Sequence, residues 1–161
     1  MKRSTLLLAL AMLLPLAAQA AEVKVEFKDP DKMVDPGNRG RERDRNFKTL
    51  TEYLQKLGEK LPASQSLSIT FTALDLAGQY EPWHSQPGSE DIRYLRSITW
   101  PSARLQFRLS EGDKTISEGE DSIADMNYQL SVRSDNGDRL FFDKRLLQTW
   151  FDKRFLSTDK P

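Results

Sequence analysis

Five apolar residues in the first half of the chain recur at alternating intervals of three and four positions. That spacing places them on one face of an α-helix, and residues between them such as Thr51, Glu52 and Lys56 fall on other faces. Pro62 cannot continue a helix and marks its end. A helix with a single apolar face must bury that face against another element. The five residues are Phe47, Leu50, Leu54, Leu57 and Leu61.

The rest of the chain supplies the elements against which such a helix can pack. Several segments alternate apolar and polar residues, as half-buried strands do. A second helix is predicted near the C-terminus, with Leu147, Trp150 and Phe151 on its apolar face. Asp125–Val132 is ambiguous between a strand and an irregular segment. The alternating segments are residues 23–27, 67–73, 92–100, 103–109 and 115–123.

This order of elements predicts one fold class. A sheet with one apolar face and two helices with apolar stripes can bury these apolar surfaces together when the helices cover that face of the sheet. We therefore expect an α+β domain of two layers, with a mostly antiparallel sheet of four to five strands and two helices on one face.

The N-terminus has the parts of a secretory signal peptide. Lys2 and Arg3 provide positive charge, an apolar run follows, and Ala18-Gln19-Ala20 places small residues at a cleavage site. The apolar run is shorter than the roughly 20 residues of a membrane-spanning helix. We expect residues 1–20 to be removed, which leaves residues 21–161 as a single domain in the periplasm or outside the cell, with no membrane span after cleavage.

Charge and cysteine content exclude several functions. The chain has 24 basic and 24 acidic residues, and removal of Lys2 and Arg3 leaves a slight acidic excess. Such a chain has no broad electrostatic attraction to nucleic acid, so we expect no nucleic-acid partner. The absence of cysteine excludes disulfides, thiol chemistry and cysteine-ligated metals, so an apolar core must stabilise the fold.

The sequence contains no recognisable catalytic constellation. His84 is the single histidine, whereas a catalytic histidine-metal site usually needs two or three. The motifs of zinc metalloproteases, serine hydrolases, P-loops and dinucleotide-binding folds are absent. We therefore assign no catalytic residue, no metal site and no cofactor.

Four carboxylates beside one loop leave an enzymatic alternative open. Glycosidases work with two carboxyl groups, and Asp75, Glu81, Glu90 and Asp91 flank the same segment. The alternative is a small carboxylate-dependent hydrolase that uses Asp75 or Glu81 on cell-wall glycan or peptide. It requires two carboxyl groups that face one pocket, one of them with a raised pKa.

The segment from Gln79 to Glu90 is the candidate binding surface. Structureless connections of about 12 residues are uncommon in compact domains and are usually functional or disordered. Prolines within the segment restrict the chain, and tryptophan and tyrosine often anchor interfaces. An alternative is that Tyr80 and Trp83 fold back and cap an open end of the core. The predicted ligand- or partner-binding residues are Tyr80, Trp83 and His84 in the segment, and Asp75, Asp91 and Arg93 at its base.

Several short strings, taken in order, resemble an exported bacterial family known as domain of unknown function 3016. The resemblance covers essentially residues 21–161. It implies a periplasmic or secreted protein, and it implies no activity, ligand or catalytic residue. The strings are Asp29-Pro30-Asp31-Lys32, Asp75-Leu76-Ala77-Gly78, Asp91-Ile92-Arg93, Trp100-Pro101, Ala124-Asp125-Met126-Asn127-Tyr128 and Trp150-Phe151.

These observations favour a non-enzymatic binding or interaction module of the cell envelope, whose partner is an envelope protein, a cell-wall component or a small ligand. The hydrolase is the second hypothesis. A metal-handling protein is the third, and the single histidine and absent cysteine disfavour it.

Overall fold

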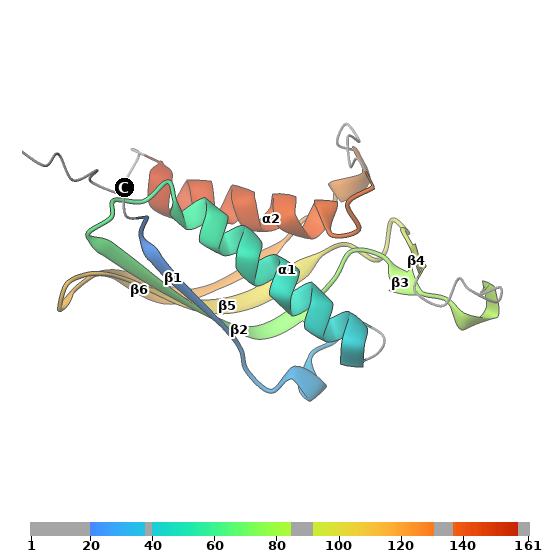
Figure 1. The fold of residues 1–161 in the computed structure, drawn as a ribbon. Coiled ribbons are helices and arrows are strands. Elements are labelled where there is room, and N and C mark those ends of the chain that lie inside the picture. The colour runs from blue at the N-terminus through green and yellow to red at the C-terminus, as the bar shows by residue number, and fades with distance from the viewer. Residues whose placement is uncertain (1–19, 38–39, 85–91, 131–136, 158–161) are drawn as a thin grey trace, which may run out of the picture.

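A computed structural model describes residues 20–37, 40–84, 92–130 and 137–157 (Figure 1). Most of the predicted signal peptide, residues 1–19, lies outside the described residues. Three 3₁₀ turns, at Pro30–Lys32, Pro82–His84 and Tyr128–Leu130, connect the main elements, and a π-helical turn at Asp152–Leu156 extends the last helix. The main elements are β1 (Glu22–Phe27), α1 (Gly40–Gly58), β2 (Gln65–Asp75), β3 (Gln79–Tyr80), β4 (Arg93–Tyr94), β5 (Ser102–Glu111), β6 (Lys114–Ala124) and α2 (Phe141–Phe151).

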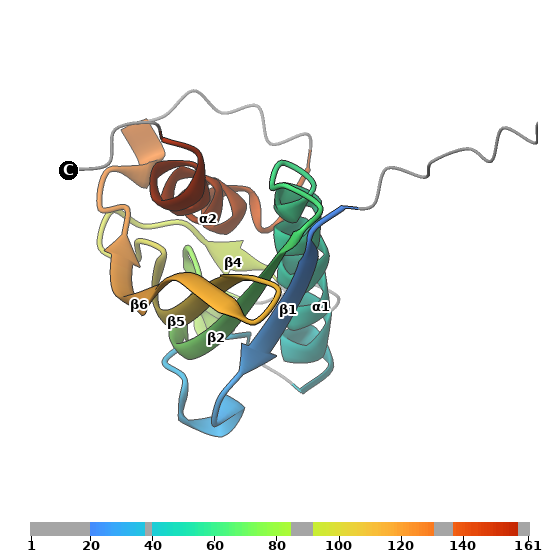
Figure 2. The same cartoon turned by 90° about the vertical axis from the view of Figure 1, so that its left-hand side faces the viewer.

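The main sheet has four strands in the order β1-β2-β5-β6, and β3 pairs with β4 in a separate two-stranded ribbon. β1 runs parallel to β2, whereas β2, β5 and β6 are antiparallel to their neighbours. The predicted mix of helices with a mostly antiparallel sheet is confirmed. Both helices lie on the same side of the sheet, and none of the described helices covers the other face (Figures 1 and 2).

Alternation along the central strands divides the sheet into a buried and an exposed face. In β2, Leu67, Ile69 and Phe71 are buried, whereas Ser68 is exposed. β5 follows the same rule, with buried Leu105 and Phe107 on the helix side. One continuous apolar core therefore joins the sheet to both helices.

The apolar stripe of α1 is buried as predicted. Leu50 and Leu54 are fully buried, and Phe47 stacks on Phe27 of β1 with 3.9 Å between ring centroids. The helix ends at Gly58, before Pro62, yet Leu61 remains in the core. A Cβ atom at position 58 would lie 2.2 Å from the Val23 side chain, so the close contact between α1 and β1 requires glycine there.

α2 packs against the opposite edge of the sheet. Leu147, Trp150 and Phe151 are buried, as the spacing predicts. Trp150 Nε1 donates a 2.8 Å hydrogen bond to Asp121 on β6. Asp121 also pairs with Arg154, so one carboxylate ties the edge strand to the end of the helix. No helix within the described ranges is long and apolar enough to cross a membrane.

The predicted strand over residues 92–100 is wrong. Only Arg93 and Tyr94 are extended, and they pair with β3 instead of joining the main sheet. The chain then turns, with Thr99 N–H donating to the Arg96 carbonyl, and Ile98 is 75% exposed. The alternating pattern therefore gave a wrong prediction for this segment, because its apolar residues do not share a buried face.

The ambiguous segment Asp125–Val132 is not a strand within its described part, which ends at residue 130. Tyr128 is fully buried against Phe142, with ring centroids 4.8 Å apart, and its hydroxyl donates to the Arg96 carbonyl at 2.8 Å. Leu130, two residues later, is 84% exposed. One aromatic side chain thus anchors an irregular segment and explains its mixed pattern.

Candidate functional site

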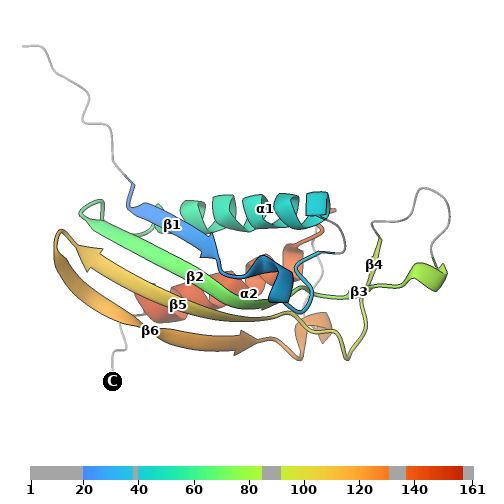
Figure 3. The ribbon, with the colours of Figure 1, turned by 90° about the horizontal axis from the view of Figure 1, so that it is seen from below.

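The β3–β4 ribbon, taken together with the 3₁₀ turn at Pro82–His84, carries four of the six predicted site residues and projects from the end of the main sheet (Figures 1 and 3). Its base follows directly from β2 through Leu76, Ala77 and Gly78. Gly78 has a φ of +75°, and a Cβ atom there would lie 2.9 Å from the Tyr94 carbonyl oxygen. Only glycine combines that backbone angle with so close an approach, so this residue sets the direction in which the ribbon leaves the sheet.

Arg93 locks the base of the ribbon. Its Nη1 and Nη2 atoms donate to the two carboxylate oxygens of Asp35, at 3.1 and 2.7 Å. The same guanidinium donates to the carbonyls of Leu76, Ala77 and Gly78, and its side chain is only 8% exposed. The donors of this predicted site residue are therefore used in contacts within the protein, and Arg93 positions the ribbon.

Two further carboxyl groups lie at this base. Burial and the neighbouring Asp35 carboxylate raise the pKa of Asp75, against the lowering effect of Arg93. Asp143, at the start of α2, accepts a 3.0 Å hydrogen bond from Ala77 N–H through Oδ1. Burial raises the pKa of Asp143 to about 7, and its Oδ2 atom has no hydrogen-bond partner.

Glu81 organises the far part of the ribbon. Its side chain is 3% exposed, and it accepts hydrogen bonds from Arg96 Nε at 3.1 Å and Nη2 at 2.9 Å. Gln79 Nε2 donates to it at 3.0 Å, and His84 Nδ1 lies 2.9 Å from Oε2. The hydrogen bonds from Arg96 and then from Gln79 lower the pKa of Glu81 to about 2. A buried, ionised carboxylate thus holds residues 79–84 and Arg96 together.

Aromatic side chains surround this ion cluster. The His84 and Tyr94 rings meet edge to face at 5.2 Å, and the Arg96 guanidinium lies 5.9 Å from the centre of the Tyr94 ring. The Trp83 ring, within the 3₁₀ turn, lies with its centroid 6.2 Å from that of the His84 ring, but the residue is 71% exposed. The alternative in which Trp83 caps the core is therefore wrong, because most of the indole is in solvent.

Tyr80 has a different environment. It is partly buried and, with Gln79, forms one side of a groove of about 590 Å³. Asp31, Asp35 and Arg43 also line this groove. Arg43 pairs with Asp31, so this part of the lining is polar. The structure thus brings Tyr80 and Trp83 onto one ribbon, with a polar groove beside Tyr80.

Two of the predicted residues cannot be placed. Asp91, and Glu90 of the hydrolase alternative, lie outside the described residues. Among those that are described, Asp75 belongs to the base of the ribbon with Arg93, whereas Glu81 belongs to the separate Arg96 cluster. Glu81 stays ionised far below neutral pH and so does not supply the raised pKa that the hydrolase requires.

The sequence interpretation missed Asp35, Arg96 and Asp143. Arg96 interrupts the apolar spacing between Ile92 and Trp100, and that interruption was a usable signal of a polar partner. Asp143 carries no such signal, because a carboxylate in the first turn of a helix ordinarily faces water and favours the helix N-terminus. Its burial depends on the approach of Ala77 from a distant part of the chain.

Comparison with known proteins gives a family without a function. A family model described as "Protein of unknown function (DUF3016)" matches residues 21–153. No curated protein and no solved structure matches the chain.

Proposed function

The chain belongs to the family Protein of unknown function (DUF3016), and we propose that it is an exported, non-enzymatic binding module of the cell envelope. Its partner is an envelope protein or a cell-wall component. One observation carries the proposal: Trp83 is 71% exposed on a short ribbon that a buried ion cluster holds in shape.

The chemistry of that ribbon supports binding over catalysis. An exposed indole on an ordered turn offers a large apolar contact surface at little cost in conformational entropy. The charged groups of the ribbon, Glu81 and Arg93, are engaged in structural contacts. Tyr80 and the polar groove beside it extend the proposed surface toward α1.

Export is part of the proposal. The charged start, the apolar run and Ala18-Gln19-Ala20 favour removal of residues 1–20. The family match begins at residue 21, directly after the expected cleavage site, which supports a separate role for the residues before it. Intact protein from the periplasmic or secreted fraction should begin at Ala21 by mass spectrometry. A mature form that retains Met1 would contradict export by this signal.

The test of binding uses a pair of exposed residues. Trp83→Ala removes the proposed anchor, and Leu130→Ala removes another strongly exposed apolar side chain elsewhere. Wild type and both variants are immobilised and exposed to envelope extract and to purified cell-wall sacculi. We expect Trp83→Ala to lose the partner that the wild type and Leu130→Ala retain, while the free energies of unfolding of the three proteins stay within about 0.5 kcal/mol of one another. Equal retention by all three proteins would contradict the proposal.

A further inference from the structure

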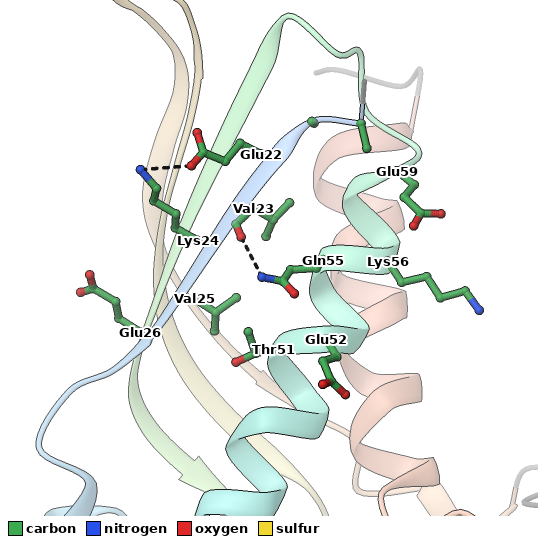
Figure 4. Close-up of a pocket in the computed structure, with 12 residues that line it drawn as sticks. Glu22, Val23, Lys24, Val25, Glu26, Thr51, Glu52, Gln55, Lys56 and Glu59 are labelled. Atoms are coloured by element: carbon green, nitrogen blue, oxygen red, sulfur yellow. Dashed lines mark hydrogen bonds and ion pairs between the residues drawn. The ribbon is translucent and has the colours of Figure 1, made fainter. Parts of the chain in front are cut away.

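The free edge of β1 is a second surface with the geometry of a binding site. β1 is the first strand in the sheet order, so within the described residues its one paired neighbour is β2. Figure 4 shows α1 beside that edge, and between them lies a groove of about 840 Å³. The groove is lined by β1 residues and by side chains of α1, among them Thr51, Glu52 and Gln55.

The register of β1 shows which backbone groups face the groove. Lys28 N–H donates to the Phe71 carbonyl, so the backbone of this residue faces β2. Backbone direction alternates along a strand, so Val23, Val25 and Phe27 direct their N–H and C=O groups away from β2. Gln55 Nε2 donates to the Val23 carbonyl at 3.5 Å from the groove side, which agrees with this alternation (Figure 4).

An unpaired edge of this kind can accept an additional strand. At the opposite edge, β6, the exposed Glu118 and Glu120 already pair with Arg108 and Gln106 of β5. On β1 the exposed residues are Glu22, Lys24 and Glu26, and Lys24 lies 3.3 Å from Glu22. The β1 edge is therefore mixed in charge, and it has a helix beside it as a second wall.

The charges of the groove indicate what fits it. Its walls carry four glutamates and two lysines, so an occupant with positive side chains meets a net negative surface. We infer that the β1–α1 groove binds an extended, basic peptide segment of another protein, which adds to the sheet as a strand beside β1. The six groove charges are Glu22, Lys24, Glu26, Glu52, Lys56 and Glu59.

The probe is a short peptide with the sequence Lys-Val-Thr-Val-Lys. Its lysines can face Glu22 and Glu26 while its threonine faces Lys24, and because it is palindromic its direction does not matter. The comparison peptide replaces both lysines with glutamate. We expect the lysine peptide to shift the backbone amide resonances of Val23, Val25 and Phe27, and to bind about tenfold more tightly than the glutamate peptide. The absence of these shifts, or equal binding of the two peptides, would overturn the inference.

Two matched variants separate strand addition from simple charge attraction. Val25→Pro removes an N–H group that faces the groove, and Ser122→Pro removes an N–H group that faces outward from β6. Asp125 N–H donates to the Pro101 carbonyl, so residue 125 faces β5, and the backbone of residue 122, three positions earlier, faces away from it. Val25→Pro should weaken binding of the lysine peptide about tenfold, and Ser122→Pro should leave it unchanged. Equal effects of the two prolines would contradict pairing at β1.

A charge reversal tests the inference without altering the backbone. Glu26→Lys lies on the exposed face of β1 and leaves three glutamates and three lysines in the groove, so the preference for the lysine peptide over the glutamate peptide should be lost. An unchanged preference would overturn the basic character of the occupant. A concentration-dependent dimer that Val25→Pro abolishes would instead identify a second copy of the chain as the occupant. None of these experiments involves Trp83, so the proposals for the two binding surfaces are tested independently of each other.

Discussion

Arg96 donates to both carboxylate oxygens of the buried Glu81, and this pair ties the aromatic turn at residues 82–84 to the chain that follows β4. The pair lies beyond the main sheet, and the aromatic residues of the ribbon, Tyr80, Trp83 and Tyr94, are not part of the apolar core. The ribbon therefore owes its shape to charge-assisted hydrogen bonds more than to core packing.

The first prediction concerns this pair. Glu81→Gln removes the charge that Arg96, Gln79 and His84 share. We expect faster amide hydrogen exchange at residues 79–84 with little change for β2 and β5. In the wild type this protection should persist as the pH falls through 4.5 and should be lost only near pH 2, because the pKa of Glu81 is lowered to about 2. Unchanged exchange in Glu81→Gln would show that the ion cluster does not order the ribbon.

The second prediction concerns the base of the ribbon. Arg93→Ala leaves the Asp35 carboxylate and three carbonyls without their shared donor, so it should lower the free energy of unfolding by about 3–5 kcal/mol. Arg93→Lys should not restore stability, because an ammonium group cannot span both carboxylate oxygens. Arg104→Ala, an exposed control on β5, should cost less than about 0.5 kcal/mol. Denaturant unfolding that gives the same value for Arg93→Ala and Arg104→Ala would contradict this role.

The arrangement around Arg93 also shows which parts of the structure can be predicted from sequence patterns and which cannot. The apolar stripes of α1 and α2 and the alternation in the strands predicted both helices, the four strands of the main sheet and most of the core, because periodic burial leaves a periodic signature. The ribbon has no such signature, since two-residue strands are too short to show a period. Asp35 and Asp143 were missed for a related reason: their partners, Arg93 and Ala77, are 58 and 66 residues away.

The third prediction follows from Asp143, whose pKa is raised to about 7 by burial. The folded state holds this proton more tightly than the unfolded state, so the stability that the protonated form contributes is lost as pH rises from about 4 to about 7. Asp143→Asn should remove that slope. At pH 8 it should be about 1–3 kcal/mol more stable than the wild type, because the gain of about 4 kcal/mol from three pKa units is offset by burial of an amide without a full set of partners.

Asp113→Asn provides the control for this measurement. Asp113 lies exposed in the turn between β5 and β6, so its substitution should leave the pH dependence of unfolding unchanged. Denaturant midpoints measured between pH 4 and pH 8 distinguish the three proteins. A wild-type slope that survives in Asp143→Asn would assign the titration to another group.

The most direct test of the proposed binding surface places a photoreactive amino acid at position 83 in the protein as it is produced in cells. The same substitution at position 130 serves as the control, because Leu130 is also strongly exposed. Illumination of intact cells should give a discrete crosslinked species from position 83 and none from position 130. Equal crosslinking at the two positions, or none at position 83, would contradict the claim that the Trp83 ribbon is where this protein meets its partner.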